Sequence, residues 1–139
     1  MDVDECRHRF AAAPHGYLAT ADPAGRPHVV PVTFAVTEDE VVTAVDHKPK
    51  RTGDPHRMRR LRNIAANPRV SLLADHYDEE WDELWWVRAD ATASVVDDGP
   101  VHERAVALLA ARYPQYREVR PTGPVILATV SRWTGWSAR

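Results

Sequence analysis

The longest regular pattern in the chain is an alternation of apolar and polar residues over positions 84–96. One set of alternate side chains is apolar: Trp85, Val87, Ala89, Ala91, Ala93 and Val95. The other set is mainly polar: Trp86, Arg88, Asp90, Thr92 and Ser94. A period of two residues is that of a strand with one buried face. The pattern therefore predicts a strand long enough to span one wall of a β-barrel.

Five shorter runs predict further strands. They cover residues 17–21, 28–36, 41–45, 70–75 and 125–132. The first two runs flank a segment with proline and glycine, Asp22-Pro-Ala-Gly-Arg26, which is typical of a hairpin turn. Pro31 interrupts the second run. Because proline donates no hydrogen bond to a strand ladder, Pro31 predicts an edge strand or a bulge.

Three segments carry helix signals, namely residues 2–13, 58–67 and 100–112. The second of these places Leu61, Ile64 and Ala65 on one face and arginines on the other. Residues 113–124 are predicted to be a loop. Strands joined by mostly antiparallel connections, with a few short helices, predict a mainly β fold in which helices close the ends or gaps of a small barrel.

Length and composition limit the class of protein. A chain of 139 residues without a break in composition predicts a single domain over residues 1–139. The net charge of -2 argues against a general nucleic-acid binder. One cysteine, Cys6, fits a reducing compartment, and the sequence has neither a signal-peptide pattern nor an apolar run of membrane-spanning length. We therefore expect a cytoplasmic protein without a membrane partner.

Positive charge is concentrated in residues 47–62, which hold seven of the 18 lysines and arginines: Lys48, Lys50, Arg51, Arg57, Arg59, Arg60 and Arg62. Arginine forks and lysine point charges between a strand and a helix could clamp a phosphate. The alternative is that these charges are solvated and balance the acidic run 75–83. The seven histidines show no spacing typical of metal ligands, so no metal site is predicted.

The sequence resembles a known family, the flavin and deazaflavin split β-barrel proteins related to pyridoxamine 5'-phosphate oxidase. The resemblance lies in residues 17–20, 22–28, 31–34, 46–51, 60–72 and 112–116, in that order and spacing. These segments are similar to the actinobacterial subgroup of coenzyme F-420-dependent oxidoreductases. The resemblance implies a split β-barrel of the FMN-binding-protein type, with six to seven mostly antiparallel strands.

The resemblance also implies a homodimer with two cofactor sites at the subunit interface. It places a set of residues near the cofactor phosphate: Lys48, Lys50, Arg51, Arg60 and Asn63, with Arg57 beside them. Pro31, Val32 and Thr33 would line the cofactor ring. The implied reaction is hydride transfer from reduced F-420 to a small organic acceptor. No catalytic side chain is identified, because the proton could come from a side chain or from water.

Three alternatives stay open at the level of sequence. The prosthetic group could be FMN, which would make the protein an FMN-binding oxidoreductase similar to pyridoxamine 5'-phosphate oxidase. The protein could bind a flavin or deazaflavin without turnover. It could also hold a tetrapyrrole, although the scattered histidines give this little support.

Overall fold

The computed structural model describes residues 1–45 and 53–139. Its strands are β1 (Gly16–Ala21), β2 (Pro27–Val32), β3 (Ala35–Thr37), β4 (Glu40–Ala44), β5 (Arg69–His76), β6 (Trp85–Val96) and β7 (Val125–Ser137). Its α-helices are α1 (Val3–Ala12), α2 (Arg59–Ala66), α3 (Gly99–Arg112) and α4 (Pro114–Glu118). Two short 3-10 helices, η1 (Pro55–Arg57) and η2 (Trp81–Glu83), precede α2 and β6.

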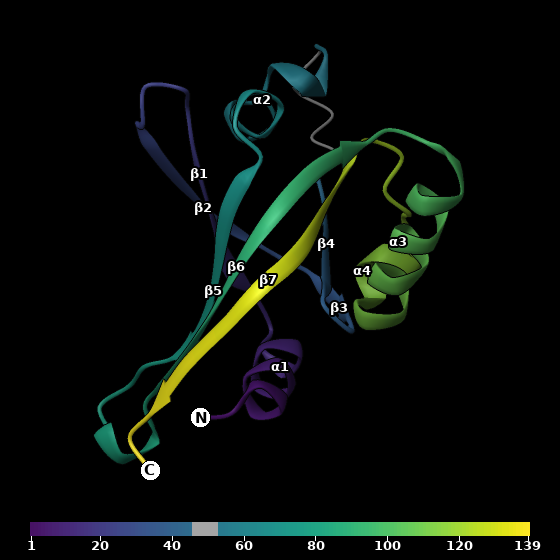
Figure 1. The fold of residues 1–139 in the computed structure, drawn as a ribbon. Coiled ribbons are helices and arrows are strands. Elements are labelled where there is room, and N and C mark those ends of the chain that lie inside the picture. The colour runs from purple at the N-terminus through teal and green to yellow at the C-terminus, as the bar shows by residue number, and fades with distance from the viewer. Residues whose placement is uncertain (46–52) are drawn as a thin grey trace.

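The seven strands form one sheet in the order β2-β1-β5-β6-β7-β4-β3 (Figure 1). Every neighbouring pair is antiparallel. The predicted mainly β, split-barrel fold is therefore confirmed. Pro31 lies in β2 at an edge of this sheet, where the missing N–H leaves no ladder bond unmade, so the edge-strand prediction is also confirmed.

The inner face of the sheet forms the main hydrophobic core. Val87, Ala89, Ala91 and Ala93 of β6 are buried, as the alternation predicts. Helix α1 lies over this face, and the ring of its Phe10 is 4.7 Å from that of Phe34 between centroids. A smaller cluster forms where α3 packs on β3 and β4. The two clusters lie on opposite faces of the sheet, because Val41 and Ile126 belong to the main core whereas their neighbours Val42 and Val125 belong to the smaller cluster. The face opposite the main core is called here the outer face, and α3 covers the part of it formed by β3 and β4.

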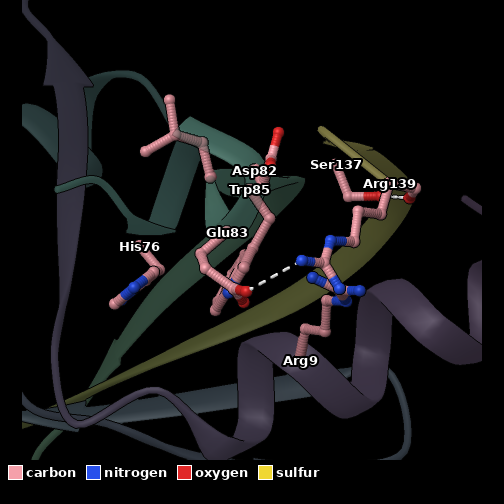
Figure 2. Close-up of a pocket in the computed structure, with 8 residues that line it drawn as sticks. Arg9, His76, Asp82, Glu83, Trp85, Ser137 and Arg139 are labelled. Carbon is pink, nitrogen blue, oxygen red and sulfur yellow. Dashed lines mark hydrogen bonds and ion pairs between the residues drawn. The ribbon is translucent and has the colours of Figure 1, made fainter. Parts of the chain in front are cut away.

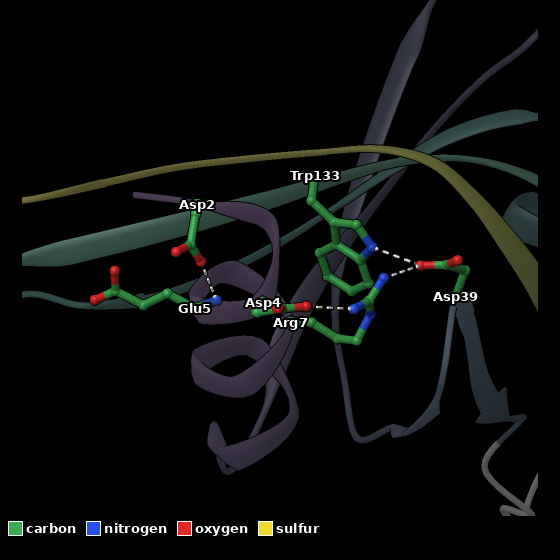
Figure 3. Close-up of polar contacts among 6 residues, drawn as sticks. All are labelled: Asp2, Asp4, Glu5, Arg7, Asp39 and Trp133. Carbon is green, nitrogen blue, oxygen red and sulfur yellow. Dashed lines mark hydrogen bonds and ion pairs between the residues drawn. The ribbon is translucent and has the colours of Figure 1, made fainter.

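A polar contact also fastens α1 to the sheet (Figure 3). Asp39, in the turn between β3 and β4, accepts hydrogen bonds from Arg7 Nη2 at 2.6 Å and from Trp133 Nε1 at 3.1 Å. Asp2 caps the helix by accepting from the backbone N–H of Glu5 at 2.8 Å. Three elements that are distant in sequence therefore meet at one carboxylate.

The run 28–36 is not one strand, which corrects the sequence prediction. Strand β2 ends at Val32 and β3 begins at Ala35, so the chain passes from one part of the sheet to another through Thr33 and Phe34. The Tyr113 hydroxyl accepts from the N–H of Phe34 at 3.1 Å and lies 3.0 Å from its carbonyl oxygen. The Tyr113 hydroxyl thus takes the place of a neighbouring strand as hydrogen-bond partner of the Phe34 backbone. The pattern of residues within the run cannot reveal this partner.

Three further predictions were partly wrong. Residues 114–118 of the expected loop form α4, which begins at a proline in the first helical turn. Strand β7 continues past residue 132 to Ser137, because β6 offers pairing partners as far as Trp85. Ala65 is exposed, whereas Leu61 and Ile64 are buried as expected. None of the helices in the described ranges is long and apolar enough to cross a membrane.

Candidate cofactor site

The predicted phosphate contacts fall into two groups. Lys48, Lys50 and Arg51 lie outside the described residues, and their assignment stays a prediction. Arg57 is exposed at the end of η1, and Arg60 is partly buried in the first turn of α2. Arg57 and Arg60 therefore both lie at the N-terminal end of α2.

The η1 segment is tied to the end of β6. Asp54 caps η1 by accepting from the N–H of His56 at 2.9 Å. The His56 Nε2 atom lies 2.6 Å from Asp97 Oδ1, just beyond the last residue of β6. The hydrogen bond to Asp97 raises the pKa of the His56 imidazole above its ordinary value. The η1 segment, which precedes the arginines of α2, is thus attached to the end of β6.

Asn63 faces the sheet and is buried, with 4% of its surface exposed. Its Nδ2 donates to Thr20 Oγ1 in β1 at 3.0 Å. Asn63 is buried together with Leu61 and Ile64, whereas Arg59 and Arg62 are exposed. In the described structure the Asn63 amide therefore joins α2 to β1, and direct contact of Asn63 with a phosphate stays a prediction.

The three predicted ring-lining residues do not share one face. Pro31 is exposed on the outer face, whereas Val32 belongs to the core cluster. The Thr33 hydroxyl lies 2.8 Å from that of Tyr116 in α4, and its carbonyl oxygen accepts from Thr43. A planar ring on the outer face could therefore meet the side chain of Pro31 but not that of Val32.

A groove of about 600 Å³ crosses the outer face and was not predicted. It is lined by Ala19, Thr20, Ala21, Pro27, Arg69, Val70, Ser71, Asp90, Ala91, Thr92 and Ser131. Ala19 pairs with Ser71 across β1 and β5, and Ser71 pairs with Asp90 across β5 and β6. Small side chains in successive strands leave a shallow trough on the sheet. Thr20 accepts the hydrogen bond from Asn63 on the buried face of β1, so α2 packs on the side of the sheet opposite the groove.

The polar groups of the groove have a definite arrangement. Ser71 Oγ donates to Asp90 Oδ1 at 2.8 Å, and Ser131, at the bulge in β7, donates to the Asp90 carbonyl at 3.0 Å. Arg69 is exposed at the first position of β5, and no salt bridge joins it to another described side chain. The groove therefore combines a carboxylate held by Ser71 and a guanidinium with small side chains such as Ala19 and Ala21.

Sequence reasoning missed these residues for an identifiable reason. The alternation in β6 assigned Asp90 and Thr92 to a polar face, but it could not show that Ala19 and Ser71 lie beside them. The usable signal was the small size of the outward residues in β1 and β5. These small residues indicate a groove only once the strand order shows that β1, β5 and β6 are neighbours.

A second hollow of about 340 Å³ lies near the chain termini, between α1 and the start of β6 (Figure 2). Its charged groups are largely paired. Arg139 contacts Glu83 at 3.3 Å, Arg9 contacts Glu5 at 2.9 Å, and His76 contacts Asp78 at 2.9 Å. These pairs make this hollow a poorer site for a charged cofactor than the outer groove. No cluster of histidine, cysteine or carboxylate side chains in the described ranges could hold a metal ion.

The fold agrees with a comparison against known families. The family model described as pyridoxamine 5'-phosphate oxidase matches residues 3–137. The chain therefore belongs to the pyridoxamine 5'-phosphate oxidase family.

Among curated proteins, 61 residues are 36% identical to 5a,11a-dehydrotetracycline/5a,11a-dehydrooxytetracycline reductase from Streptomyces rimosus. The match covers 44% of this chain and 39% of the relative, so the chain spans about two fifths of that protein. A solved structure of a conserved hypothetical protein from Mycobacterium tuberculosis has a TM-score of 0.79 at 22% identity, covering 100% of this chain and 86% of the other. A FAD-binding protein from Mesorhizobium loti has a TM-score of 0.69 at 20% identity, with coverages of 97% and 92%.

Proposed function

We propose that this protein is an oxidoreductase that binds coenzyme F-420 and transfers hydride to a small organic acceptor. The observation that carries the proposal is the outer groove, in which small side chains of β1, β5 and β6 lie beside the guanidinium of Arg69. A planar ring could lie on the small side chains, and a phosphate could bind the guanidinium. The choice of a deazaflavin rests on the sequence resemblance described above.

The dimensions and chemistry of the groove suit such a cofactor. A volume of about 600 Å³ is within the range that accommodates cofactors and similar ligands. Arg69 and Arg60 lie within one short stretch of chain, at the start of β5 and in the first turn of α2. Guanidinium groups bind phosphate through paired hydrogen bonds, and lysines 48 and 50 would add positive charge.

The residues of the chain would mainly orient the reactants and limit access of water. Ala19 and Ala21 would contact one face of the ring, leaving its other face for the acceptor. Asp90, held by Ser71, would accept a hydrogen bond from a polar edge of the bound ring. When bound, the reduced deazaflavin supplies a hydride, and a proton from a side chain or water completes the reduction of the acceptor.

We propose that the functional unit is a homodimer with cofactor sites at the subunit interface. The groove is open on one side in the single chain, and a second copy would cover it. The curated relative supports a reductive role, because its name describes a reductase of dehydrotetracyclines. FMN stays the second candidate, favoured by the similar fold of the FAD-binding protein from Mesorhizobium loti.

Replacing the groove and helix arginines tests the site. We expect Arg69→Gln and Arg60→Gln each to weaken F-420 binding about tenfold or more, because each removes a charge-assisted hydrogen bond. Calorimetric titration of the purified dimer measures the change. Arg120→Gln, an exposed arginine between α4 and β7, is the matched control and should bind as the wild type does. Unchanged affinity in both site variants would contradict the assignment.

Turnover separates an enzyme from a cofactor carrier. We expect the protein with reduced F-420 to reduce at least one member of a panel of enones, quinones and pterins. Reappearance of the visible absorbance of the oxidised deazaflavin reports the reaction. Tight binding without turnover across the panel would favour a protein that only stores or carries the cofactor.

A further inference from the structure

Three side chains of the outer face form a patch at one end of the groove. Trp86 and Arg88 lie on β6, and Trp136 lies on β7, where it pairs with Trp86 across the two strands. Alternate residues along a strand project from the same face of a sheet. Since Val87 and Ala89 belong to the main core, Trp86 and Arg88 project from the outer face. Trp86, Arg88 and Trp136 are called here the indole patch.

The indole patch continues the groove along β6. Asp90 lines the groove, and the Arg88 Nε atom lies 3.7 Å from Asp90 Oδ2. Alternate residues of a strand are about 7 Å apart, so Trp86 is two such steps from Asp90. Helix α3 packs on β3, β4 and the start of β7 near Val125, away from the C-terminal end of β7 (Figure 1). A ligand on the patch would therefore lie beside a ring bound in the groove.

The guanidinium of Arg88 is available to a ligand. Its Cζ atom lies 5.4 Å from the centroid of the Trp86 ring, a distance typical of a cation–π contact. The ion pair with Asp90 joins side chains that are 43% and 38% exposed, so it stabilises only weakly. Within residues 1–45 and 53–139, Arg88 makes no side-chain hydrogen bond. An anionic oxygen could therefore accept hydrogen bonds from the terminal nitrogens of Arg88.

A hydroxyl without a partner lies next to this guanidinium. Thr134 is directly opposite Arg88 in the pairing of β6 with β7, so both residues belong to the outer face. The Thr134 Oγ1 atom is buried, and no described group forms a hydrogen bond with it. An unpaired buried hydroxyl is unfavourable unless a ligand satisfies it. When Arg88 turns toward a ligand oxygen, the Thr134 hydroxyl can donate to the same oxygen.

Trp136 supplies an open aromatic surface at the other side of the patch. Its side chain is among the exposed large apolar groups, with 43% of its surface accessible. In the described part of the chain, neither an aromatic ring nor a cation stacks on it. An indole of this kind can stack on a planar unsaturated ligand. The patch thus places a stacking surface beside a cation and a free hydroxyl.

We propose that the indole patch binds the hydride acceptor, and that this acceptor is a planar, unsaturated molecule with an anionic oxygen, such as a carboxylate or an enolate. Trp136 stacks on the planar part, whereas Arg88 and Thr134 bind the anionic oxygen. Trp86 is a positioning residue, because it acts through Arg88. This inference rests on the proposed oxidoreductase function and adds the chemical class of the acceptor.

A charged and a neutral probe test the patch directly. The probes are naphthoate and its neutral amide, naphthamide, each titrated calorimetrically into the wild-type protein without a cofactor. We expect naphthoate to bind about tenfold or more tightly than naphthamide, because only naphthoate forms a charge-assisted contact with Arg88. Arg88→Gln should abolish this preference, and Arg88→Lys, which keeps the charge, should retain part of it. Trp136→Leu should weaken both probes by similar factors.

Two variants away from the patch are matched controls. Arg120→Gln removes an exposed guanidinium between α4 and β7, and Trp81→Leu removes an exposed indole from η2. Both should bind the two probes as the wild type does. Equal affinity of the wild type for the two probes, or Arg88→Gln and Trp136→Leu variants with wild-type affinities, would overturn the assignment. Variants that change only the association of copies would give the patch to a subunit contact instead, which also overturns it.

Cofactor titration of the wild type is a separate measurement. Failure to bind F-420 or FMN would refute the proposed function, whereas the probe titrations contain no cofactor and report only on the indole patch.

Discussion

At the scale of single residues, Asp39 illustrates how one carboxylate secures distant elements. The hydrogen bond from Arg7, and after it the one from Trp133, holds the pKa of the Asp39 carboxyl below its usual range. Because the carboxylate is ionised more readily in the folded chain than in the unfolded chain, this contact stabilises the fold above the unfolded pKa of about 3.9. The stabilisation is lost as pH falls through the folded pKa.

Asp39→Asn should therefore lower stability in a pH-dependent way. The variant keeps the shape of the side chain and removes its charge, so we expect its free energy of unfolding at pH 7 to be below that of the wild type. The difference should shrink as pH falls through the depressed folded pKa, where the wild-type carboxyl is also neutral. Urea unfolding across the acid range measures this. Asp98→Asn, whose side chain makes no capping hydrogen bond, should show no comparable difference.

At the scale of elements, the passage from β2 to β3 shows what periodicity can and cannot predict. The run 28–36 has strand composition throughout, and both halves do form strands. The break between them depends on Tyr113, which is 79 positions away from Phe34. A local pattern contains no information about such a partner. The same holds for Asn63, whose buried position depends on Thr20 of β1.

Removing the hydroxyl of Tyr113 tests whether its hydrogen bonds to Phe34 fix the passage from β2 to β3. Tyr113→Phe leaves the Phe34 N–H without its partner, and we expect a loss of about 1–3 kcal/mol in the free energy of unfolding. Chemical denaturation measures the loss. Tyr17→Phe is the matched control, because its hydroxyl makes a 3.5 Å contact at the surface with His15. Equal stability of the two variants would mean that Tyr113 does not fix the passage between the strands.

At the scale of the whole molecule, the fold class follows from the sequence because alternation in β6 and the turn residues are local signals. The strand order does not, since β1 pairs with β5 although three other strands and α2 lie between them in the sequence. The candidate site was likewise only partly predictable from the sequence. Positive charge near α2 was visible in residues 57–62, whereas the groove needs Ala19, Ser71 and Asp90 to come together from three strands.

The predicted homodimer belongs to this largest scale. A single chain presents a groove that is open on the outer face. A second copy placed over the groove would cover it. Binding of the cofactor and association of the copies are therefore expected to strengthen one another.

The most direct test of the account is a titration of the wild-type protein with coenzyme F-420 and, separately, with FMN. The five tryptophans serve as internal reporters, and quenching of their fluorescence measures binding. We predict saturable quenching by F-420 at low concentration and much weaker binding of FMN. Preference for FMN, or no response to either cofactor, would contradict the proposed deazaflavin-dependent function.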